Sequence, residues 1–202
     1  MNRTYSKLII LASAMLAFAF SAAGCAPLVV GGAAVAGASA IHDRRPTQTI
    51  LDDRQIEFAA TQAIFQDRDL SRGARLVVTS YNRTVLITGQ AESAELARRA
   101  GNRISRLPKV ARVIDEVRVG PRIGMSRQSE DAYIASRAKL ELAGIGLPDF
   151  DPTRVKIVVE DGDLYLLGLV TPREADLAAE RVRYVPGVRK VVKLFEYWTP
   201  NA

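Results

Sequence analysis

The sequence predicts an α+β protein built from two tandem copies of one unit, each running helix, strand, strand, helix, strand. Two observations predict this arrangement. Similar segments recur in the same order and at nearly constant spacing in the two halves, and each copy contains two apolar runs separated by residues that favour a tight turn. A hairpin followed by a crossover helix gives a small mixed three-stranded sheet with two helices on one face. The 202 residues are enough for two such domains.

The two predicted hairpins are "VTSYNRTVLITGQ" (78–90) and "VVEDGDLYLLGLV" (158–170). Each places turn residues, "YNRT" or "EDGD", between two apolar runs. Gly89 and Gly168 close the second strand of each copy. The acidic "DGD" is interpreted as a turn, because the acids around it lack the spacing of a helix-loop-helix calcium site. We expect no bound metal.

The first helix of each copy is predicted from an apolar stripe at a spacing of four residues. The stripes are Ile56, Ala60 and Ile64 in the first copy, and Ile134, Ala138 and Leu142 in the second. We expect both stripes to face a core, and Asp52 and Asp53 to cap the first helix. A second helix in each copy precedes a Pro-X-Val motif and a third, alternating strand.

The N-terminus has the pattern of a secretory signal. Arg3 and Lys7 precede an uncharged apolar segment, and small residues follow just before Cys25, the single cysteine of the chain. The stretch Ala22-Ala23-Gly24-Cys25 resembles the bacterial lipoprotein signal. The resemblance implies cleavage before Cys25 and its acylation with palmitate-like chains. Because Ala26 rather than Asp follows the cysteine, it also implies an outer-membrane location.

A transmembrane helix is the alternative interpretation, since residues 8–41 contain no charged side chain. Pro27 interrupts that run, and the Gly- and Ala-rich part after it is more typical of a tether. The predicted division of the chain is a signal peptide at 1–24, a lipidated tether at 25–50, a first domain at 51–120, a linker at 121–128 and a second domain at 129–198.

Each copy resembles the BON domain, a module of bacterial envelope proteins. The glycine after the second strand and the Pro-X-Val before the third, in "LPKVARVIDEV" and "VPGVRKVVKLFEY", carry the resemblance. Two copies behind a lipoprotein signal are similar to dual-BON outer-membrane lipoproteins. This resemblance implies binding to anionic phospholipid, such as phosphatidylglycerol, at the periplasmic face of the outer membrane. It also implies a role in envelope integrity and no catalysis.

Composition and charge narrow the function further. The net charge is +6, and it becomes +4 (26 basic against 22 acidic residues) once residues 1–24 are removed. The basic residues alternate with acids, which argues against nucleic-acid binding. The single histidine, His42, lies in the tether, and the single cysteine would be acylated, so the predicted domains contain no His- or Cys-based catalytic pair. We expect no enzyme activity, no cofactor and no small-molecule substrate.

The two copies differ on the first helix, which suggests a candidate site. Tyr133, Arg137 and Leu140 of the second copy share one helix face, distinct from the apolar core stripe. An aromatic ring, a guanidinium and a leucine suit the membrane interface, and Lys139 nearby adds attraction for anionic headgroups. The first copy has Gln55, Ala59 and Gln62 at the aligned positions. The resemblance likewise implies lipid contact at this helix.

Three questions stay open at this point. Tyr133 and Leu140 could instead pack against the first domain or the linker, as often happens between tandem domains. Trp198 could anchor at the membrane or cover the end of the last strand. The exposed helix face could also serve a protein partner, which would make the chain a scaffold docking onto an envelope assembly machine.

Overall fold

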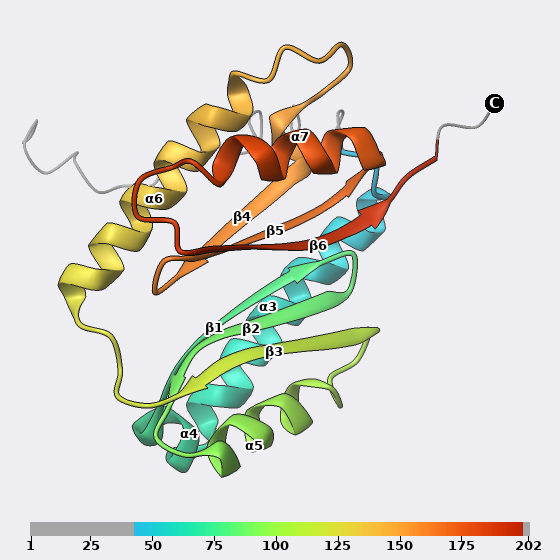
Figure 1. The fold of residues 1–202 in the computed structure, drawn as a ribbon. Coiled ribbons are helices and arrows are strands. Elements are labelled where there is room, and N and C mark those ends of the chain that lie inside the picture. Colours follow the sequence, from blue (N-terminus) through green and yellow to red (C-terminus); the bar gives the residue numbers. More distant parts are fainter. Residues whose placement is uncertain (1–42, 200–202) are drawn as a thin grey trace, which may run out of the picture. The chain divides into compact units, whose positions relative to one another are not determined.

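The computed structural model describes residues 43–199, which belong to one compact unit, His42–Ala202 (Figure 1). The predicted signal peptide, Cys25 and most of the predicted tether lie outside the described residues. Within the described part, the fold consists of two repeats of the same element order. The predicted α+β class, with two small mixed sheets, is confirmed.

The first repeat contains three helices and one three-stranded sheet. Its elements are α3 (Thr47–Gln66), the short α4 (Arg68–Gly73), β1 (Ala74–Tyr81), β2 (Thr84–Ala91), α5 (Ala94–Ile104) and β3 (Arg112–Val119). The sheet order is β1-β2-β3, in which β1 and β2 pair antiparallel and β2 and β3 pair parallel. The parallel pair follows from the crossover through α5.

The second repeat has the same topology. Its elements are α6 (Met125–Ala143), the 3₁₀ turn η2 (Pro152–Arg154), β4 (Val155–Glu160), β5 (Asp163–Val170), α7 (Pro172–Val182) and β6 (Lys190–Tyr197). The order β4-β5-β6 again combines one antiparallel and one parallel pair. Helix α7 begins with a capping box, since Thr171 and Glu174 each accept a hydrogen bond from the other's backbone N–H.

The first helix begins at Thr47, before the predicted domain boundary at 51. The residues just before it are held by ion pairs with buried acids. Arg45 Nη1 lies 2.7 Å from Asp53 Oδ2, and Arg44 Nη1 lies 2.6 Å from Glu174 Oε2. Burial alone would raise the pKa of Glu174, but the hydrogen bonds from Arg44 and Thr171 hold it below its ordinary value. The last residues assigned to the tether are therefore part of the fold.

Both hairpins turn through two residues with positive φ. The angles are 50° and 64° at Asn82 and Arg83, and 48° and 77° at Asp161 and Gly162. This is the backbone of a type I′ turn, which matches the twist of the flanking strands. Asp161 also pairs with arginines, including Arg127 Nε at 2.8 Å. Burial alone would raise the pKa of Asp161, but these partners hold it below its ordinary value.

A buried aspartate on the first helix of each repeat holds the hairpin turn. Asp53 accepts hydrogen bonds from the backbone N–H groups of Asn82 (2.8 Å) and Arg83 (2.7 Å). Asp131, at the aligned position of the second repeat, accepts the equivalent bonds from Asp161 (2.7 Å) and Gly162 (2.8 Å). Each bond satisfies a backbone donor that the tight turn would otherwise leave without a partner.

The predicted capping role of Asp52 and Asp53 is wrong. Both residues lie inside α3, which starts earlier than expected, so neither can satisfy the free N–H groups of its first turn. Asp52 instead accepts from Lys109 Nζ (2.6 Å) and from Arg83 Nη2 (2.7 Å). These contacts join residues far apart in the sequence.

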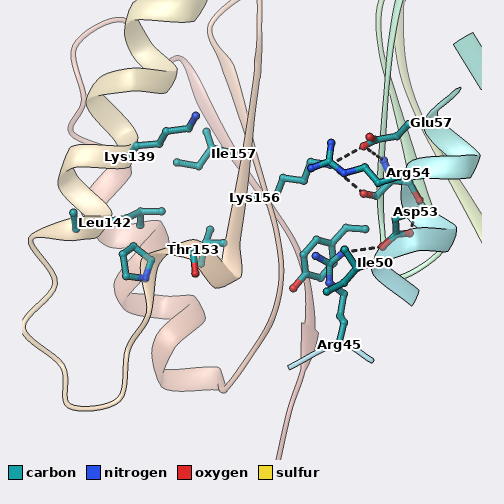
Figure 2. Close-up of a pocket in the computed structure, with 15 residues that line it drawn as sticks. Arg45, Ile50, Asp53, Arg54, Glu57, Lys139, Leu142, Thr153, Lys156 and Ile157 are labelled. Carbon is teal, nitrogen blue, oxygen red and sulfur yellow. Dashed lines mark hydrogen bonds and ion pairs between the residues drawn. The ribbon is translucent and has the colours of Figure 1, made fainter. Parts of the chain in front are cut away.

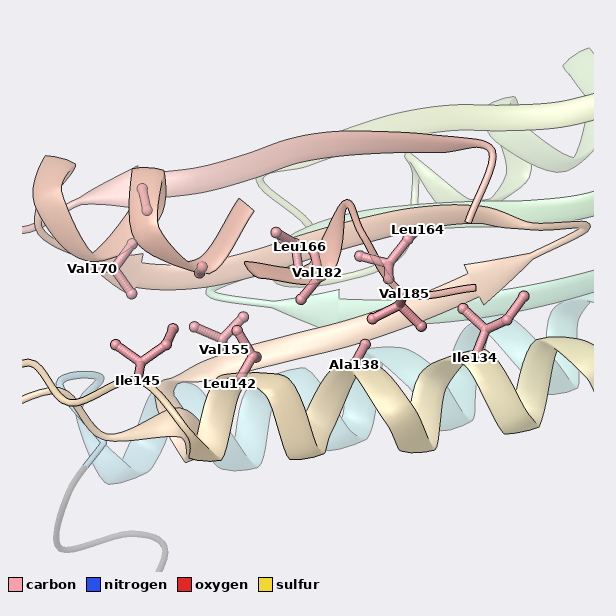
Figure 3. Packing of buried hydrophobic residues seen from close by; sticks show 12 residues of the cluster. Ile134, Ala138, Leu142, Ile145, Val155, Leu164, Leu166, Val170, Val182 and Val185 are labelled. Carbon is pink, nitrogen blue, oxygen red and sulfur yellow. The ribbon is translucent and has the colours of Figure 1, made fainter. Parts of the chain in front are cut away.

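The two predicted helix stripes face the core. Ile134, Ala138 and Leu142 are buried in the second repeat's cluster, against the inward side chains of β5 and α7 (Figure 3). In the first repeat Ile56 and Ala60 are fully buried, and Ile64 packs partly buried against them.

The second face of each sheet packs against the other repeat. Along β2, Val85 and Ile87 face the helices whereas Leu86 joins a separate cluster. That cluster also contains Tyr81 from the first repeat and Tyr165 and Leu167 from the second, so it spans the two sheets. Because side chains alternate across a strand, the central strands β2 and β5 are buried on both sides.

Polar contacts reinforce this joint between the repeats. Arg75 Nη1 lies 2.7 Å from Glu160 Oε1, and Gln90 Nε2 donates to the same carboxylate at 2.7 Å. Lys156 Nζ lies 2.6 Å from Glu57 Oε1. Burial raises the pKa of Tyr165, whose ring lies in the apolar centre of the joint.

Candidate functional site

Helix α6 presents the predicted face to solvent. Its opposite side carries Ile134, Ala138 and Leu142 into the core, which orients the helix. Tyr133 is 60% exposed and Leu140 is 63% exposed, and Arg137 is exposed as well. Within residues 43–199, these side chains are therefore not covered by the first repeat or the linker.

Lys139 lies apart from the other three predicted residues. It is six positions after Tyr133, which is about 120° around an α-helix. It points into a cleft between the repeats, where it faces Ile157 of β4 (Figure 2). The predicted set is thus divided: Tyr133, Arg137 and Leu140 form one face, and Lys139 belongs to the cleft.

The cleft has a volume of about 550 Å³ and is lined by both first helices and by the strands β1 and β4. Its walls are partly apolar, with Ile50, Leu142 and Ile157 among them. Four cations and two carboxylates line it, which makes it net positive. These are Arg45, Arg54, Lys139, Lys156, Asp53 and Glu57.

The carboxylates of the cleft are already occupied. Asp53 holds the hairpin turn and pairs with Arg45, and Glu57 pairs with Lys156 and accepts from the backbone N–H of Ser80 at 2.9 Å. Burial alone would lower the pKa of Arg45, but the hydrogen bonds that its guanidinium donates to the Asp43 carboxylate hold it above its ordinary value. Among the described residues, no cluster of His, Cys, Asp and Glu has the geometry of a metal site. Of these ion pairs, Lys156–Glu57 joins the two repeats, whereas Arg45–Asp53 lies within the first repeat.

Trp198 lies at the end of the last strand. Its backbone N–H donates to Val170 O at 2.9 Å, and the Arg44 guanidinium lies 4.1 Å from the centre of its ring. The ring is half-buried under this cation–π contact. These contacts favour the covering role over the anchoring one.

Helix α3 carries an exposed apolar face that the comparison of the two copies missed. Leu51 is 52% exposed, Phe58 is 71% exposed and Phe65 is 79% exposed. The comparison of the two copies was limited to Gln55, Ala59 and Gln62 in the first copy, and these residues lie beside the exposed apolar face. The spacing of seven residues between the three apolar side chains was the signal that could have found it.

The part of the chain that the structure describes contains no helix of the length and hydropathy needed to span a bilayer.

The fold contains two copies of a mixed three-stranded sheet covered by helices. Comparison with known protein families assigns both copies to the same family. The BON domain model matches residues 52–121 and 130–197. The chain therefore belongs to the BON-domain family, as its sequence motifs predicted.

Two curated relatives cover most of the chain. The outer membrane lipoprotein DolP of Haemophilus influenzae is 33% identical over 174 residues, which is 86% of this chain and 89% of that protein. A protein named 21 kDa hemolysin from Actinobacillus pleuropneumoniae is 34% identical over 155 residues, covering 77% of this chain and 79% of that one. Together with the two domains, this similarity shows a dual-BON outer-membrane lipoprotein.

A solved structure, the C-terminal domain of CdsD from the type III secretion system of Chlamydia trachomatis, covers 73% of this chain with 12% identity and a TM-score of 0.28. This score is too low to support any conclusion.

Proposed function

We propose that this lipoprotein is anchored through Cys25 at the periplasmic face of the outer membrane and binds anionic phospholipid through its second BON domain. In this role it supports envelope integrity and acts by binding rather than by catalysis. The observation that carries the proposal is the exposed face of α6, with Tyr133 and Leu140 both more than half exposed.

The chemistry of this face suits a phospholipid headgroup region. The Tyr133 ring is apolar with a polar tip, a combination that is enriched where hydrocarbon meets water. Arg137 lies one helical turn away and can donate two parallel hydrogen bonds to a phosphate. Leu140, a further three residues on, can enter the acyl boundary. The three side chains form one continuous contact.

Vesicle flotation tests this proposal. The unlipidated segment 42–202, which forms one compact unit, is mixed with vesicles of phosphatidylglycerol or of phosphatidylcholine. We expect binding to the anionic vesicles and weaker binding by Tyr133→Ala. Tyr184→Ala is the matched control, because Tyr184 is a similarly exposed tyrosine in the turn after α7. Equal binding to both lipids, or equal loss with both variants, would contradict the proposal.

The scaffold function uses the same exposed face and remains the competing proposal. In that case the lipid anchor would only localise the chain, and the α6 face would contact a protein of the envelope assembly machinery. Flotation would then show no lipid preference.

Mass spectrometry of the protein extracted from membranes tests the anchor separately. We expect a mature N-terminus at Cys25 carrying acyl chains. Any other N-terminus, or an unmodified thiol, would remove the anchor from the proposal.

A further inference from the structure

Helix α3 exposes three large apolar side chains that nothing in residues 43–199 covers. Residues seven apart on an α-helix are about 20° short of two full turns, so Leu51, Phe58 and Phe65 lie nearly in line. We refer to them as the aromatic face. Both phenylalanines are more than two-thirds exposed. Exposed apolar surface of this kind commonly marks a contact site.

The surroundings of the aromatic face suit an anionic surface. The positions three, four and seven residues on either side of Phe58 contain no acidic residue. Arg54 lies on one edge and makes no hydrogen bond or ion pair within the described residues. On the other edge, Lys109 Nζ donates to Gln55 Oε1 at 2.8 Å and to Asp52 Oδ1 at 2.6 Å, and Asp52 lies on the side away from the aromatic face. A phosphate-bearing surface would meet cations at both edges and no carboxylate between them.

The position of α3 in the chain also points to the bilayer. Helix α3 begins at Thr47, and the stretch from Cys25 to Thr47 spans at most about 75 Å when fully extended. If Cys25 carries the anchor, the start of α3 stays within this distance of the membrane. Tethering of this kind raises the effective concentration of membrane at the aromatic face.

We propose that the aromatic face of α3 inserts into the headgroup region of an anionic bilayer and gives the first BON domain a membrane contact of its own. Leu51, Phe58 and Phe65 enter the boundary between headgroups and acyl chains, while Arg54 and Lys109 meet phosphates. This goes beyond the proposed function, which assigns lipid contact to the second domain.

A fluorescence experiment separates the two contacts. The 42–202 segment contains no cysteine, so Phe58→Cys, Tyr133→Cys and Tyr184→Cys each accept one environment-sensitive fluorophore. Each labelled protein is titrated with vesicles of phosphatidylglycerol mixed with phosphatidylcholine. We expect a blue shift at position 58 and none at position 184. Because all three side chains are exposed, labelling leaves the core intact.

Every outcome distinguishes the two proposals. A shift at 133 without one at 58 overturns this inference and leaves the proposed function standing. A shift at 58 without one at 133 supports this inference and contradicts the proposed function. A shift at 58 that depends on protein concentration and needs no vesicles would show that a second copy covers the face, which also overturns it.

A partition measurement adds the size of the effect. We expect Phe58→Gln combined with Phe65→Gln to weaken partition of the segment into these vesicles about tenfold, because two exposed aromatic side chains are lost. Glutamine is a good helix former, so the helix should persist, and circular dichroism checks this. Unchanged partition of a folded double variant would overturn the inference.

Discussion

The first helices of the two repeats are alike on the inside and different on the outside. Both carry an apolar stripe into the core and an aspartate that holds a hairpin turn, Asp53 in α3 and Asp131 in α6. Outside, α3 shows aliphatic and phenylalanine side chains, whereas α6 shows Tyr133, Arg137 and Leu140. The sheet constrains the inner positions, while the outer positions are free to acquire separate contacts.

The largest expected effect is a loss of stability, and we expect it to differ between the two aspartates that hold the hairpin turns, Asp53 and Asp131. Asp53 holds its turn, accepts from Ser80 Oγ at 2.6 Å and pairs with Arg45, whereas Asp131 holds only its turn. Asp53→Ala should lower the free energy of unfolding by about 3–5 kcal/mol, since two backbone N–H groups and Ser80 Oγ lose their acceptor and the buried Arg45 keeps only Asp43 as an ion-pair partner. Asp131→Ala should cost about 2 kcal/mol, because two backbone N–H groups lose their acceptor. Urea denaturation measures the free energy of unfolding of both variants. An equal loss of stability would contradict the different roles of the two aspartates.

The turn before the third strand gives the next effect. Lys109 and Gly187 occupy equivalent positions, with φ of 71° and 93°. A Cβ at Gly187 would lie 2.8 Å from Ile134 Cδ1, in addition to the strain of the left-handed backbone. Gly187→Ala should therefore cost about 2 kcal/mol in thermal or urea unfolding. If Gly187→Ala is as stable as the wild type, the Ile134 side chain must be able to move away from the added methyl group at little cost.

The acidic residue just before each hairpin aspartate is Asp52 in α3 and Glu130 in α6, and we expect the two to contribute differently to the dependence of stability on pH. The hydrogen bond from Lys109, together with those from Gln48 and Arg83, lowers the pKa of Asp52 to about 2 from an ordinary 3.8. Because the pKa is lower in the folded state, the stabilisation is complete above about pH 4 and is lost as the pH falls towards 2. Asp52→Asn should flatten the dependence of stability on pH in this window.

Glu130 is the matched control for this measurement, since it occupies the position of the second repeat that aligns with Asp52. Its side chain is more than half exposed and pairs with Arg127 within one helical turn. Glu130→Gln should leave the acid limb of the stability curve nearly unchanged, because exposed pairs contribute little. An equal flattening by both variants would show that the acid limb does not come from Asp52.

Much of the fold could be predicted because it follows local rules. The stripe at Ile134, Ala138 and Leu142 is a helix period, and the turn at Asp161-Gly162 is a backbone preference. The role of Asp53 could not be predicted, since its partners at Asn82 and Arg83 are brought to it only by folding. Acidic residues near a helix start look the same whether they cap that helix or hold a distant turn.

The candidate site was predicted in part for a related reason. Tyr133 and Leu140 lie off the core stripe, so their exposure follows from helix geometry. Lys139 is their neighbour in sequence but points into the cleft, because six residues turn a helix far past the shared face. The aromatic face of α3 was missed because the comparison started from the face that Tyr133, Arg137 and Leu140 form, and Phe58 aligns with Ser136, which lies outside that face.

Photo-crosslinking in living cells tests the central claim, lipid binding by the α6 face, most directly. A photoreactive residue replaces Tyr133 in the full-length lipoprotein, and the same residue at Tyr184 is the control. We predict that irradiation attaches phospholipid at position 133 and not at 184, which mass spectrometry of the protein detects. Adducts at 133 that contain another protein and no phospholipid would contradict the account and support the scaffold function.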